Sequence, residues 1–237
     1  DRAVQGFIDS GYAQVKKLSG ALEEDALIEA IKDVHLLGIR SKTQITSRVL
    51  QHANKLLAVG CYCIGTNQVD LQTAKEKGVV VFNSPYPNTR SVAELVIAEA
   101  IMLLRRIPEK NTAAHQGIWL KDARNCFELR GKTLGIIGYG NIGMQVSVLA
   151  EALGMRVIYT DVTTKLPMGN AQQIHQLYDL LKIADVVSLH VPEAPSTIQL
   201  LNDAALSQMK KGSILINCAR GNVIDLQALK THLLSGH

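Results

Sequence analysis

Apolar and polar positions in the first third of the chain fall into blocks of alternating helix and strand length. The expected elements are helices over 26–31, 48–53 and 69–77, and strands over 34–39, 56–59 and 79–82. Strands that alternate with helices form parallel sheets through right-handed crossovers. The run from Val34 to Ile39 is apolar almost throughout, which is typical of a strand buried on both faces. This part of the chain therefore predicts a parallel α/β unit.

The pattern changes after a cluster of helix-breaking residues, Asn83 to Pro87. Ser91 and Glu94 have the spacing of a capping box, in which both side chains bind free amides at a helix start. From Leu95 to Leu104, apolar residues cover nearly the whole circumference of the predicted helix, as in helices buried between layers or domains. We therefore expect a boundary that gives domains over residues 1–87 and 88–237.

A second alternating series begins after Lys132. Its expected elements are strands over 133–137, 157–160, 186–189 and 214–216, and helices over 141–153, 174–182 and 203–209. A further helix is expected just before the last residues of the chain. The predicted fold class is thus α/β, with two doubly wound parallel-sheet lobes.

Composition limits the possible classes of protein. The chain has 237 residues, of which 47% are hydrophobic, enough to bury a core in one large or two modest domains. The formal net charge is +4, and no run of five like charges occurs, so we expect no nucleic-acid partner. No apolar stretch approaches the ~18 residues of a membrane span, and no signal peptide is evident, so no membrane contact is expected either.

The cysteine pattern indicates a reducing environment. Cys61, Cys63, Cys126 and Cys218 form no C-x-x-C pair and have no histidine at zinc-finger spacing. We therefore expect neither disulfides nor a metal site, a cytoplasmic location, and core positions for Cys61 and Cys63.

The motif that carries most of the chemistry follows the predicted strand 133–137. Gly138, Gly140 and Gly143 form a G-x-G-x-x-G between that strand and the next helix, which is the context of a dinucleotide fingerprint. In such a motif the glycines allow a tight turn, close approach of a pyrophosphate and close packing of the helix, whose first amides bind phosphate. Asp161 lies 18 residues beyond Gly143, where a carboxylate accepts the ribose hydroxyls.

The acid also indicates which dinucleotide is bound. A carboxylate at Asp161 repels the 2′-phosphate of NADP, and residues 162–164 contain no arginine that would accept it. NAD is therefore the expected cofactor, although Lys165 is a cation close to this position.

Two later segments should face the same ligand, because sites in such sheets lie beyond the carboxyl ends of the strands. His190-Val191-Pro192 ends one strand, and the segment 217–221 ends another. Arg220 is the most informative of these residues, since a guanidinium beside a glycine can bind a carboxylate through two hydrogen bonds or polarise a carbonyl oxygen. A surface arginine is the alternative.

With these residues assembled, the chain resembles the D-isomer-specific 2-hydroxyacid dehydrogenases, most closely the bacterial-type branch that oxidises 3-phosphoglycerate in serine biosynthesis. The resemblance runs over essentially the whole chain and is carried by residues 40–43, 65–71, 88–95, 138–143, 188–192 and 217–221.

The resemblance implies a flavodoxin-like substrate-binding lobe and a Rossmann nucleotide-binding lobe, with substrate and nicotinamide in the cleft between them. It implies cofactor contacts from Asn141 and Ile142 at the pyrophosphate, Asp161 at the ribose, His190, Val191 and Pro192 along the cofactor, and Cys218 and Ala219 near the nicotinamide. It also implies substrate contacts from Arg40, Ser41, Gly65 and Asn88, with Arg220 as the catalytic residue that binds the carboxylate and C2 oxygen.

The sequence departs from the family at its ends. The family's proton-transferring histidine and its partner glutamate are expected beyond residue 237, and one strand of the first lobe is expected before Asp1. Both lobes should therefore be incomplete, and the 237-residue segment alone should be nearly inactive. His190 is the one histidine at a strand end that could substitute, but its family counterpart is a cofactor-side residue.

Three functions remain open. The first is oxidation of 3-phosphoglycerate, with Arg40, Lys42 and Lys121 as cations for the phosphate. The second is another D-2-hydroxyacid dehydrogenase, acting on glyoxylate, hydroxypyruvate or D-lactate. The third is a non-catalytic protein that senses dinucleotide. A homodimer or homotetramer is expected, and Trp119 lies in a stretch similar to the family's dimer-contacting arm, with a hydrophobic anchor as the alternative.

Overall fold

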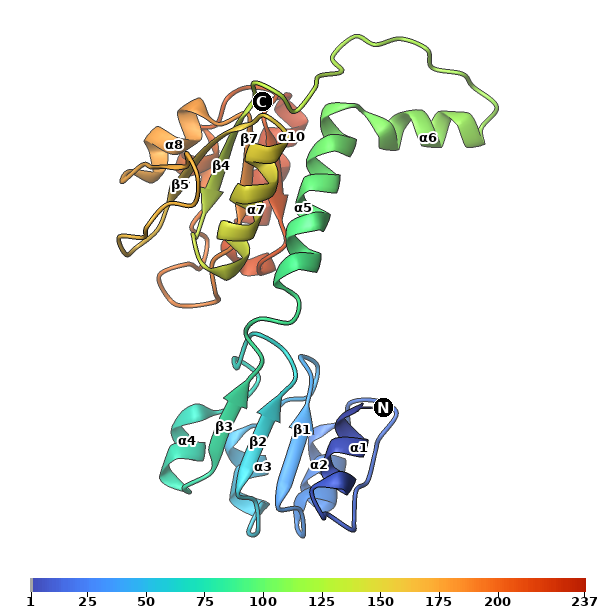
Figure 1. Ribbon diagram of the computed structural model, residues 1–237, viewed down its shortest axis with the longest axis vertical. Coiled ribbons are helices and arrows are strands. Elements are labelled where there is room, and N and C mark those ends of the chain that lie inside the picture. Colours follow the sequence, from blue (N-terminus) through green and yellow to red (C-terminus); the bar gives the residue numbers. More distant parts are fainter. Residues whose placement is uncertain (1) are drawn as a thin grey trace. The chain divides into compact units, whose positions relative to one another are not determined.

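The computed structural model describes residues 2–237, which divide into two compact units (Figure 1). The first unit ends at Pro85 and the second begins at Tyr86. This division lies two residues before the boundary that the sequence predicts.

The first unit contains a three-stranded parallel sheet. Its helices are α1 (Arg2–Asp9), α2 (Glu24–Ile31), α3 (Ser47–His52) and α4 (Leu71–Glu76), and its strands are β1 (Leu36–Ile39), β2 (Ala58–Cys61) and β3 (Val80–Asn83). The strand order is β1-β2-β3, with Leu37 opposite Val59 and Val59 opposite Val81. Residues from α2, α3 and β2, including Ile31, Leu50 and Val59, form its core.

The first sheet is less buried than its apolar runs suggest. β1 begins two residues later than expected, and of its four residues only Ile39 is buried. β3 is largely exposed, with Phe82 at 61%. Both are edge strands among the described strands. Because Leu36 and Leu37 are only half-buried and Gly38 is exposed, the expectation that 34–39 is buried on both faces is wrong for this structure.

The second unit contains a five-stranded parallel sheet with helices on both faces. Its strands are β4 (Thr133–Ile137), β5 (Arg156–Thr160), β6 (Gln172–Gln173), β7 (Val186–Leu189) and β8 (Ile214–Asn217). Its helices are α5 (Thr89–Leu104), α6 (Ile107–His115), α7 (Asn141–Ala152), α8 (Leu177–Ile183), α9 (Asp203–Leu206) and α10 (Leu226–Ser235), with a short 3₁₀ turn at Gly221–Val223.

The strand order of this sheet is β6-β5-β4-β7-β8. The chain thus starts at the central β4, adds strands on one side, and then crosses to the other side. Doubly wound sheets bind their ligands beyond the carboxyl ends of the strands at such a reversal, which lies here between β4 and β7.

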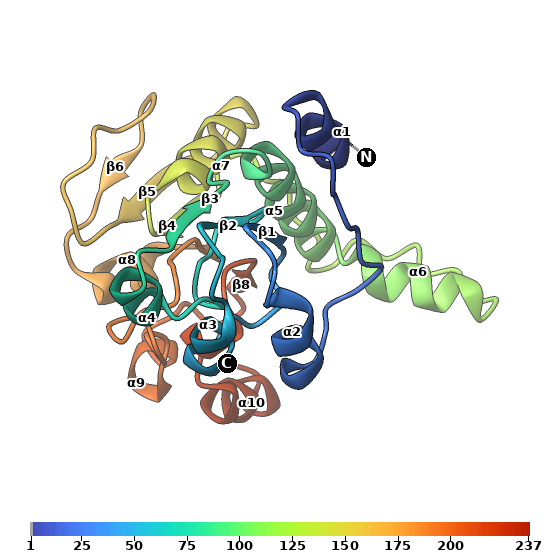
Figure 2. The ribbon, with the colours of Figure 1, turned by 90° about the horizontal axis from the view of Figure 1, so that it is seen from below.

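Alternating residues of the strands pack against different helices. Leu134 and Ile136 join the core formed with α5 and α7, whereas Ile137 joins the core formed with α8, α9 and α10. Figures 1 and 2 show α5 and α7 lying side by side, and these two helices are in extensive contact. The glycine loop is therefore held between a buried strand and a helix that is itself packed on one face.

Two expectations for α5 are wrong. The helix begins at Thr89 after Asn88, so Ser91 lies inside the first turn and its hydroxyl donates to the Asn88 carbonyl at 2.9 Å instead of capping an amide. The helix is also buried on one face only, since Leu95 and Leu103 are 50% and 43% exposed. Because apolar residues surround the whole helix, the sequence alone could not show which face packs against α7 and which face stays exposed.

Some elements carry little sequence signal. The predictions did not include α1, α6 or the two-residue β6, and α9 ends three residues earlier than expected, at Leu206. Both views show α6 and the segment after it projecting from the rest of the second unit. Such a segment makes few of the contacts that produce a regular hydrophobic period.

Candidate dinucleotide-binding site

The glycine loop requires glycine at its first position. Gly138 follows β4 with a φ of +92°, and a Cβ there would lie 2.7 Å from the carbonyl oxygen of His190 and 2.9 Å from Cγ1 of Val191. Its N–H donates to the Thr160 carbonyl at 2.9 Å. A larger residue would therefore separate the ends of β4 and β7.

The other two glycines have different surroundings. A Cβ on Gly143 would overlap the carbonyl oxygen of Gly138 and lie 3.1 Å from Cγ2 of Ile136, so α7 can approach β4 only because position 143 lacks a side chain. A Cβ on Gly140 would meet nothing within 4 Å. Gly140 is the N-cap of α7 and supplies no side-chain cap, so the first amides of the helix, those of Asn141 and Ile142 among them, have no side-chain partner at the cap.

Asp161 follows β5 and is fixed by hydrogen bonds on both oxygens. Oδ2 accepts from the N–H of Tyr139 at 2.8 Å, and Oδ1 accepts from the N–H and the hydroxyl of Thr163, each at 3.0 Å. Partial burial acts to raise the pKa of Asp161, but these hydrogen bonds and the charge of Lys165 lower it below its ordinary value. The side chain is thus a carboxylate beside the glycine loop, and it remains partly exposed.

His190 follows the last residue of β7 and is half-buried. Its ring Nε2 lies 2.9 Å from the hydroxyl of the buried Ser188. Its main-chain N–H donates to the Ile137 carbonyl. Burial lowers the pKa of His190 to about 4, so the ring is neutral at physiological pH. Val191 is half-buried against Gly138, and Pro192 is exposed.

The loop after β8 is closed by Asn217. Its Oδ1 accepts from the N–H of Ala219 and its Nδ2 donates to the carbonyl of Arg220. The half-buried guanidinium of Arg220 donates to the Ala219 carbonyl at 2.9 Å and forms no ion pair within residues 2–237. It is therefore free to bind an anion.

Cys218 in this loop lies against α5. Its thiol is 3.6 Å from Oε2 of Glu99, and burial, together with the Glu99 charge, raises the pKa of Cys218 to about 11. The group is thus a neutral thiol. All four cysteines are free, and Cys61 is buried as expected whereas Cys63 is only partly so.

The remaining predicted residues lie at two places. Arg40 and Ser41 are exposed just after β1, and Gly65 lies in the loop after β2. Because β1 and β2 are parallel neighbours, all three lie at one edge of the first sheet. Asn88 belongs to the second unit, where it precedes α5 and is exposed.

A groove of about 450 Å³ lies within the second unit, beside the start of α7. It is lined by Tyr86, Pro87, Thr89, Arg90, Asn141, Met144, Gln145 and Met168. Asn141 is the only one of these that the sequence predicted as a site residue, because the groove depends on how α5 packs against α7.

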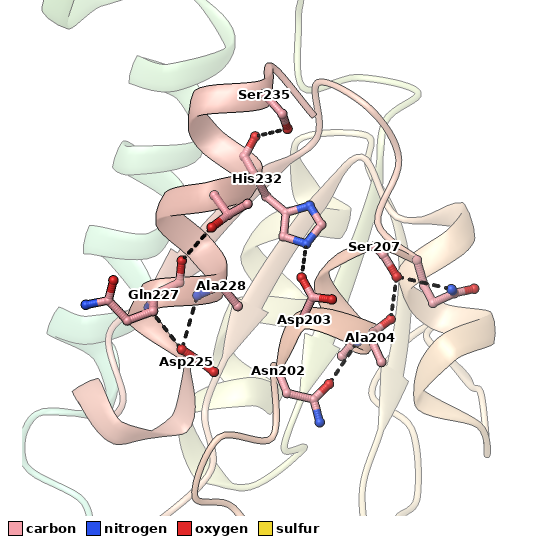
Figure 3. Close-up of polar contacts among 12 residues, drawn as sticks. Asn202, Asp203, Ala204, Ser207, Asp225, Gln227, Ala228, His232 and Ser235 are labelled. Carbon is pink, nitrogen blue, oxygen red and sulfur yellow. Dashed lines mark hydrogen bonds and ion pairs between the residues drawn. The ribbon is translucent and has the colours of Figure 1, made fainter.

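The predictions also missed a histidine–carboxylate pair. His232 of α10 places its Nε2 3.0 Å from Oδ1 of Asp203, which lies in α9 (Figure 3). The same view shows Asn202 and Asp225 accepting hydrogen bonds from amides at the starts of these two helices. Neither member of the pair follows a strand's carboxyl end, so we assign it to the packing of α9 on α10.

Residues 2–237 contain neither a metal-binding cluster nor a membrane-spanning helix. No group of three or more His, Cys, Asp or Glu side chains there could hold a metal ion. In the same residues, no helix is both long and apolar enough to span a bilayer.

Comparison with known proteins agrees with this geometry. Residues 97–237 match the NAD binding domain of the D-isomer specific 2-hydroxyacid dehydrogenases. D-3-phosphoglycerate dehydrogenase of Haemophilus influenzae is 54% identical over 227 residues, which cover 96% of this chain and 55% of that protein. The chain thus spans about half the length of this relative.

Two solved structures are similar over 99% of the chain. D-lactate dehydrogenase from Aquifex aeolicus, complexed with NAD and lactic acid, is 28% identical with a TM-score of 0.85, and 71% of its chain is covered. An acyclic imino acid reductase in complex with NADPH and D-Arg is 29% identical with a TM-score of 0.88, and 75% of its chain is covered.

The matched residues 97–237 lie within the unit that holds the glycine loop and Asp161. The expected α/β class with parallel sheets is confirmed, as is NAD as the cofactor of this domain. The chain belongs to the D-isomer-specific 2-hydroxyacid dehydrogenase family.

Proposed function

We propose that this chain is part of an NAD-dependent enzyme that interconverts 3-phosphoglycerate and 3-phosphohydroxypyruvate. The observation that carries the proposal is the hydrogen bond from the Tyr139 N–H to Asp161, which joins the glycine loop to the acid at the switch point of the second sheet. The choice of acid is supported by the relative from Haemophilus influenzae, which is named for 3-phosphoglycerate.

The residues present fit a dinucleotide. The open space at Gly140 admits a pyrophosphate to the uncapped amides of Asn141 and Ile142. Asp161 offers acceptor oxygens to the two ribose hydroxyls. We assign His190, Val191, Pro192, Cys218 and Ala219 to the wall along the cofactor. A bound NAD would supply the acceptor for the hydride that leaves C2 of the substrate.

Arg220 is the proposed catalytic residue. Its guanidinium forms no ion pair within the described residues and follows the carboxyl end of β8. A planar guanidinium binds a carboxylate through two hydrogen bonds and stabilises the charge on an oxygen at C2. Asn88 is proposed as a further substrate contact from the second unit.

On the first unit, the proposed substrate residues are Arg40, Ser41 and Gly65. Arg40 and the neighbouring Lys42 are exposed cations at the carboxyl edge of that sheet. Two cations favour a phosphorylated acid over an acid such as lactate, which carries a single charge.

Proton transfer at the C2 hydroxyl needs a group other than His190. A general base is most effective with a pKa near the working pH, and the pKa of His190 is about 4. We propose that residues 1–237 alone turn over substrate at least a hundredfold more slowly than the whole enzyme, in line with the ~10²–10⁴-fold contribution of general acid–base catalysis.

Steady-state kinetics of the full-length protein test the proposal. NAD reduction would be measured with 3-phosphoglycerate, D-glycerate and D-lactate, and NADH oxidation with glyoxylate and hydroxypyruvate. We expect kcat/KM for 3-phosphoglycerate to exceed that for D-glycerate, the matched acid without phosphate, by at least a hundredfold. A preference for an unphosphorylated acid would assign another dehydrogenase, and dinucleotide binding without turnover of any acid would indicate a sensor.

We further propose that the protein forms a homodimer or homotetramer. Trp119 is 82% exposed in the projecting segment after α6, and the open face of α5 presents further apolar side chains. Sedimentation velocity should show at least a tenfold weaker association for Trp119→Ala but not for Tyr178→Ala, a change at an exposed aromatic residue of α8. Equal association of all three proteins would contradict this assignment.

We also propose a cytoplasmic location, which the free cysteines support.

A further inference from the structure

Two buried tyrosines stack beneath the proposed ribose site. Tyr139 lies between the first two glycines of the loop and Tyr159 lies in β5, with ring centroids 3.8 Å apart and planes inclined by 18°. Their exposed fractions are 0% and 1%. A core aromatic pair needs no hydroxyl groups, so the two phenol oxygens require a separate explanation.

Both hydroxyls bind the segment that follows Asp161. The Tyr159 hydroxyl donates to the carbonyl of Lys165 at 2.8 Å. The Tyr139 hydroxyl accepts from the N–H of Met168 at 3.1 Å and donates to the hydroxyl of Ser147 at 3.0 Å. The segment from 162 to 168, which we call the ribose loop, is therefore fastened at two points to the stacked pair.

Tyr139 also holds the start of the ribose loop. Its main-chain N–H donates to Asp161, just before the ribose loop, and its hydroxyl accepts from Met168 at the end of the loop, so a single residue of the glycine loop contacts the chain on both sides. Beyond the ribose loop, the N–H of Asn170 donates to Glu151 of α7 at 2.7 Å. The path of the loop is thus set by buried side chains of the core.

Lys165 is the ionisable group on this loop that bears on cofactor choice. Its charge stabilises the Asp161 carboxylate, although the described side chains do not form a direct ion pair. A cation at this position could also attract the 2′-phosphate of NADP. Since the Lys165 main chain is held by Tyr159, where the ammonium can reach depends on that hydrogen bond.

We propose that Tyr159 and Tyr139 are positioning residues that determine cofactor specificity: by fastening the main chain of the ribose loop they keep the Lys165 ammonium from reaching a 2′-phosphate bound next to Asp161. This inference rests on the proposed assignment of Asp161 to the ribose. Release of the loop would allow Lys165 to approach the 2′-phosphate of NADP.

Hydroxyl deletion separates this role from core packing. Tyr159→Phe and Tyr139→Phe retain the stacked rings and remove one anchor each. Dissociation constants for NAD and NADP would be measured by titration calorimetry on the full chain. We expect the ratio of the NADP constant to the NAD constant to fall at least fivefold in Tyr159→Phe, and to recover when Lys165→Ala is added. Tyr178→Phe, at an exposed tyrosine of α8, should leave the ratio unchanged.

A second measurement needs no dinucleotide. Trypsin cleaves after lysine, and the bond after Lys165 lies in the fastened loop. Mass spectrometry of a brief digest should show cleavage there at least fivefold faster in Tyr159→Phe and Tyr139→Phe than in the unmutated protein or Tyr178→Phe. If one variant does not fold, the other provides both measurements.

The outcomes distinguish the possible errors. Equal weakening of NAD and NADP binding, or an unchanged ratio, would overturn the proposal and leave the tyrosines as packing residues. Unchanged cleavage after Lys165 would also overturn it, because the loop would not depend on the hydroxyls. Absence of any dinucleotide binding by the unmutated protein would instead refute the proposed function.

Discussion

The main-chain N–H of Tyr139 donates to Oδ2 of Asp161 at 2.8 Å, which joins the glycine loop to the acid at the end of the adjacent strand. The contact follows from the sheet register, because Ile137 of β4 lies opposite Thr160 of β5. Tyr139 lies two residues after Ile137 and Asp161 lies one residue after Thr160, so the two meet beyond the end of the sheet. The amides proposed for the pyrophosphate and the carboxylate proposed for the ribose are thus held together before any ligand binds.

Gly140 and Gly143 should respond differently to alanine. Gly140→Ala fits its open, extended position, so the melting temperature should stay unchanged, whereas NAD affinity should fall at least tenfold because the methyl group occupies space proposed for the pyrophosphate. Gly143→Ala gains about 1 kcal/mol of helix propensity but meets the Gly138 carbonyl, and such overpacking costs about 1–3 kcal/mol. Thermal melts and NAD titrations of both variants would check this. The assignment fails if Gly140→Ala binds NAD normally.

His190 should make stability depend on pH. Its pKa in the folded protein is about 4 against 6.5 for an ordinary histidine, so the unfolded state binds more protons between these values. Stability from the neutral ring is present above pH 6.5 and is lost as the pH falls towards 4, by about 3 kcal/mol in total and about 2 kcal/mol at pH 5.

Urea unfolding at pH 7 and pH 5 measures this effect. Between pH 7 and pH 5, the free energy of unfolding of His190→Gln should fall by about 2 kcal/mol less than that of the unmutated protein. His175→Gln removes an exposed histidine of the same unit and should behave as the unmutated protein. An identical pH dependence in His190→Gln would mean that the ring is not held neutral.

Arg220 should serve the reaction and not the fold. Arg220→Lys retains the charge but loses the planar pair of donors, so kcat/KM in the full-length enzyme should fall at least roughly tenfold, or ~1.4 kcal/mol. The melting temperature should barely change, since within residues 2–237 the guanidinium donates only to the neighbouring Ala219 carbonyl. If Arg220→Lys is largely unfolded and the fraction that remains folded has normal kinetics, Arg220 has a structural role instead.

The sequence predicted the parts of this fold that depend on local pattern. β4, the Gly138 turn and the start of α7 lie where the apolar run and glycine spacing place them. Burial of α5 was not predictable, because Leu95 and Val96 are equally apolar and only the packing on α7 makes one exposed and the other buried.

The candidate site, too, could be predicted from the sequence only where a local motif marks it. Gly140 and Asp161 could be found because a motif has fixed spacing. The Tyr139–Tyr159 stack, the Cys218–Glu99 contact and the groove beside Asn141 depend on which strands and helices are neighbours in space. Of these three features, the tyrosine stack could have been inferred from the register of β4 on β5, since that register places residues 139 and 159 at the same end of adjacent strands.

The central claim is that Asp161, held by Tyr139, makes this an NAD site, and calorimetric titration of the full-length protein with NAD and NADP tests it most directly. We predict that the unmutated protein binds NAD at least a hundredfold more tightly than NADP. Asp161→Ala should weaken NAD binding and reduce that preference to less than tenfold, because the ribose hydroxyls lose their acceptor and the 2′-phosphate no longer meets a carboxylate. Equal affinity of the unmutated protein for the two dinucleotides would contradict the account.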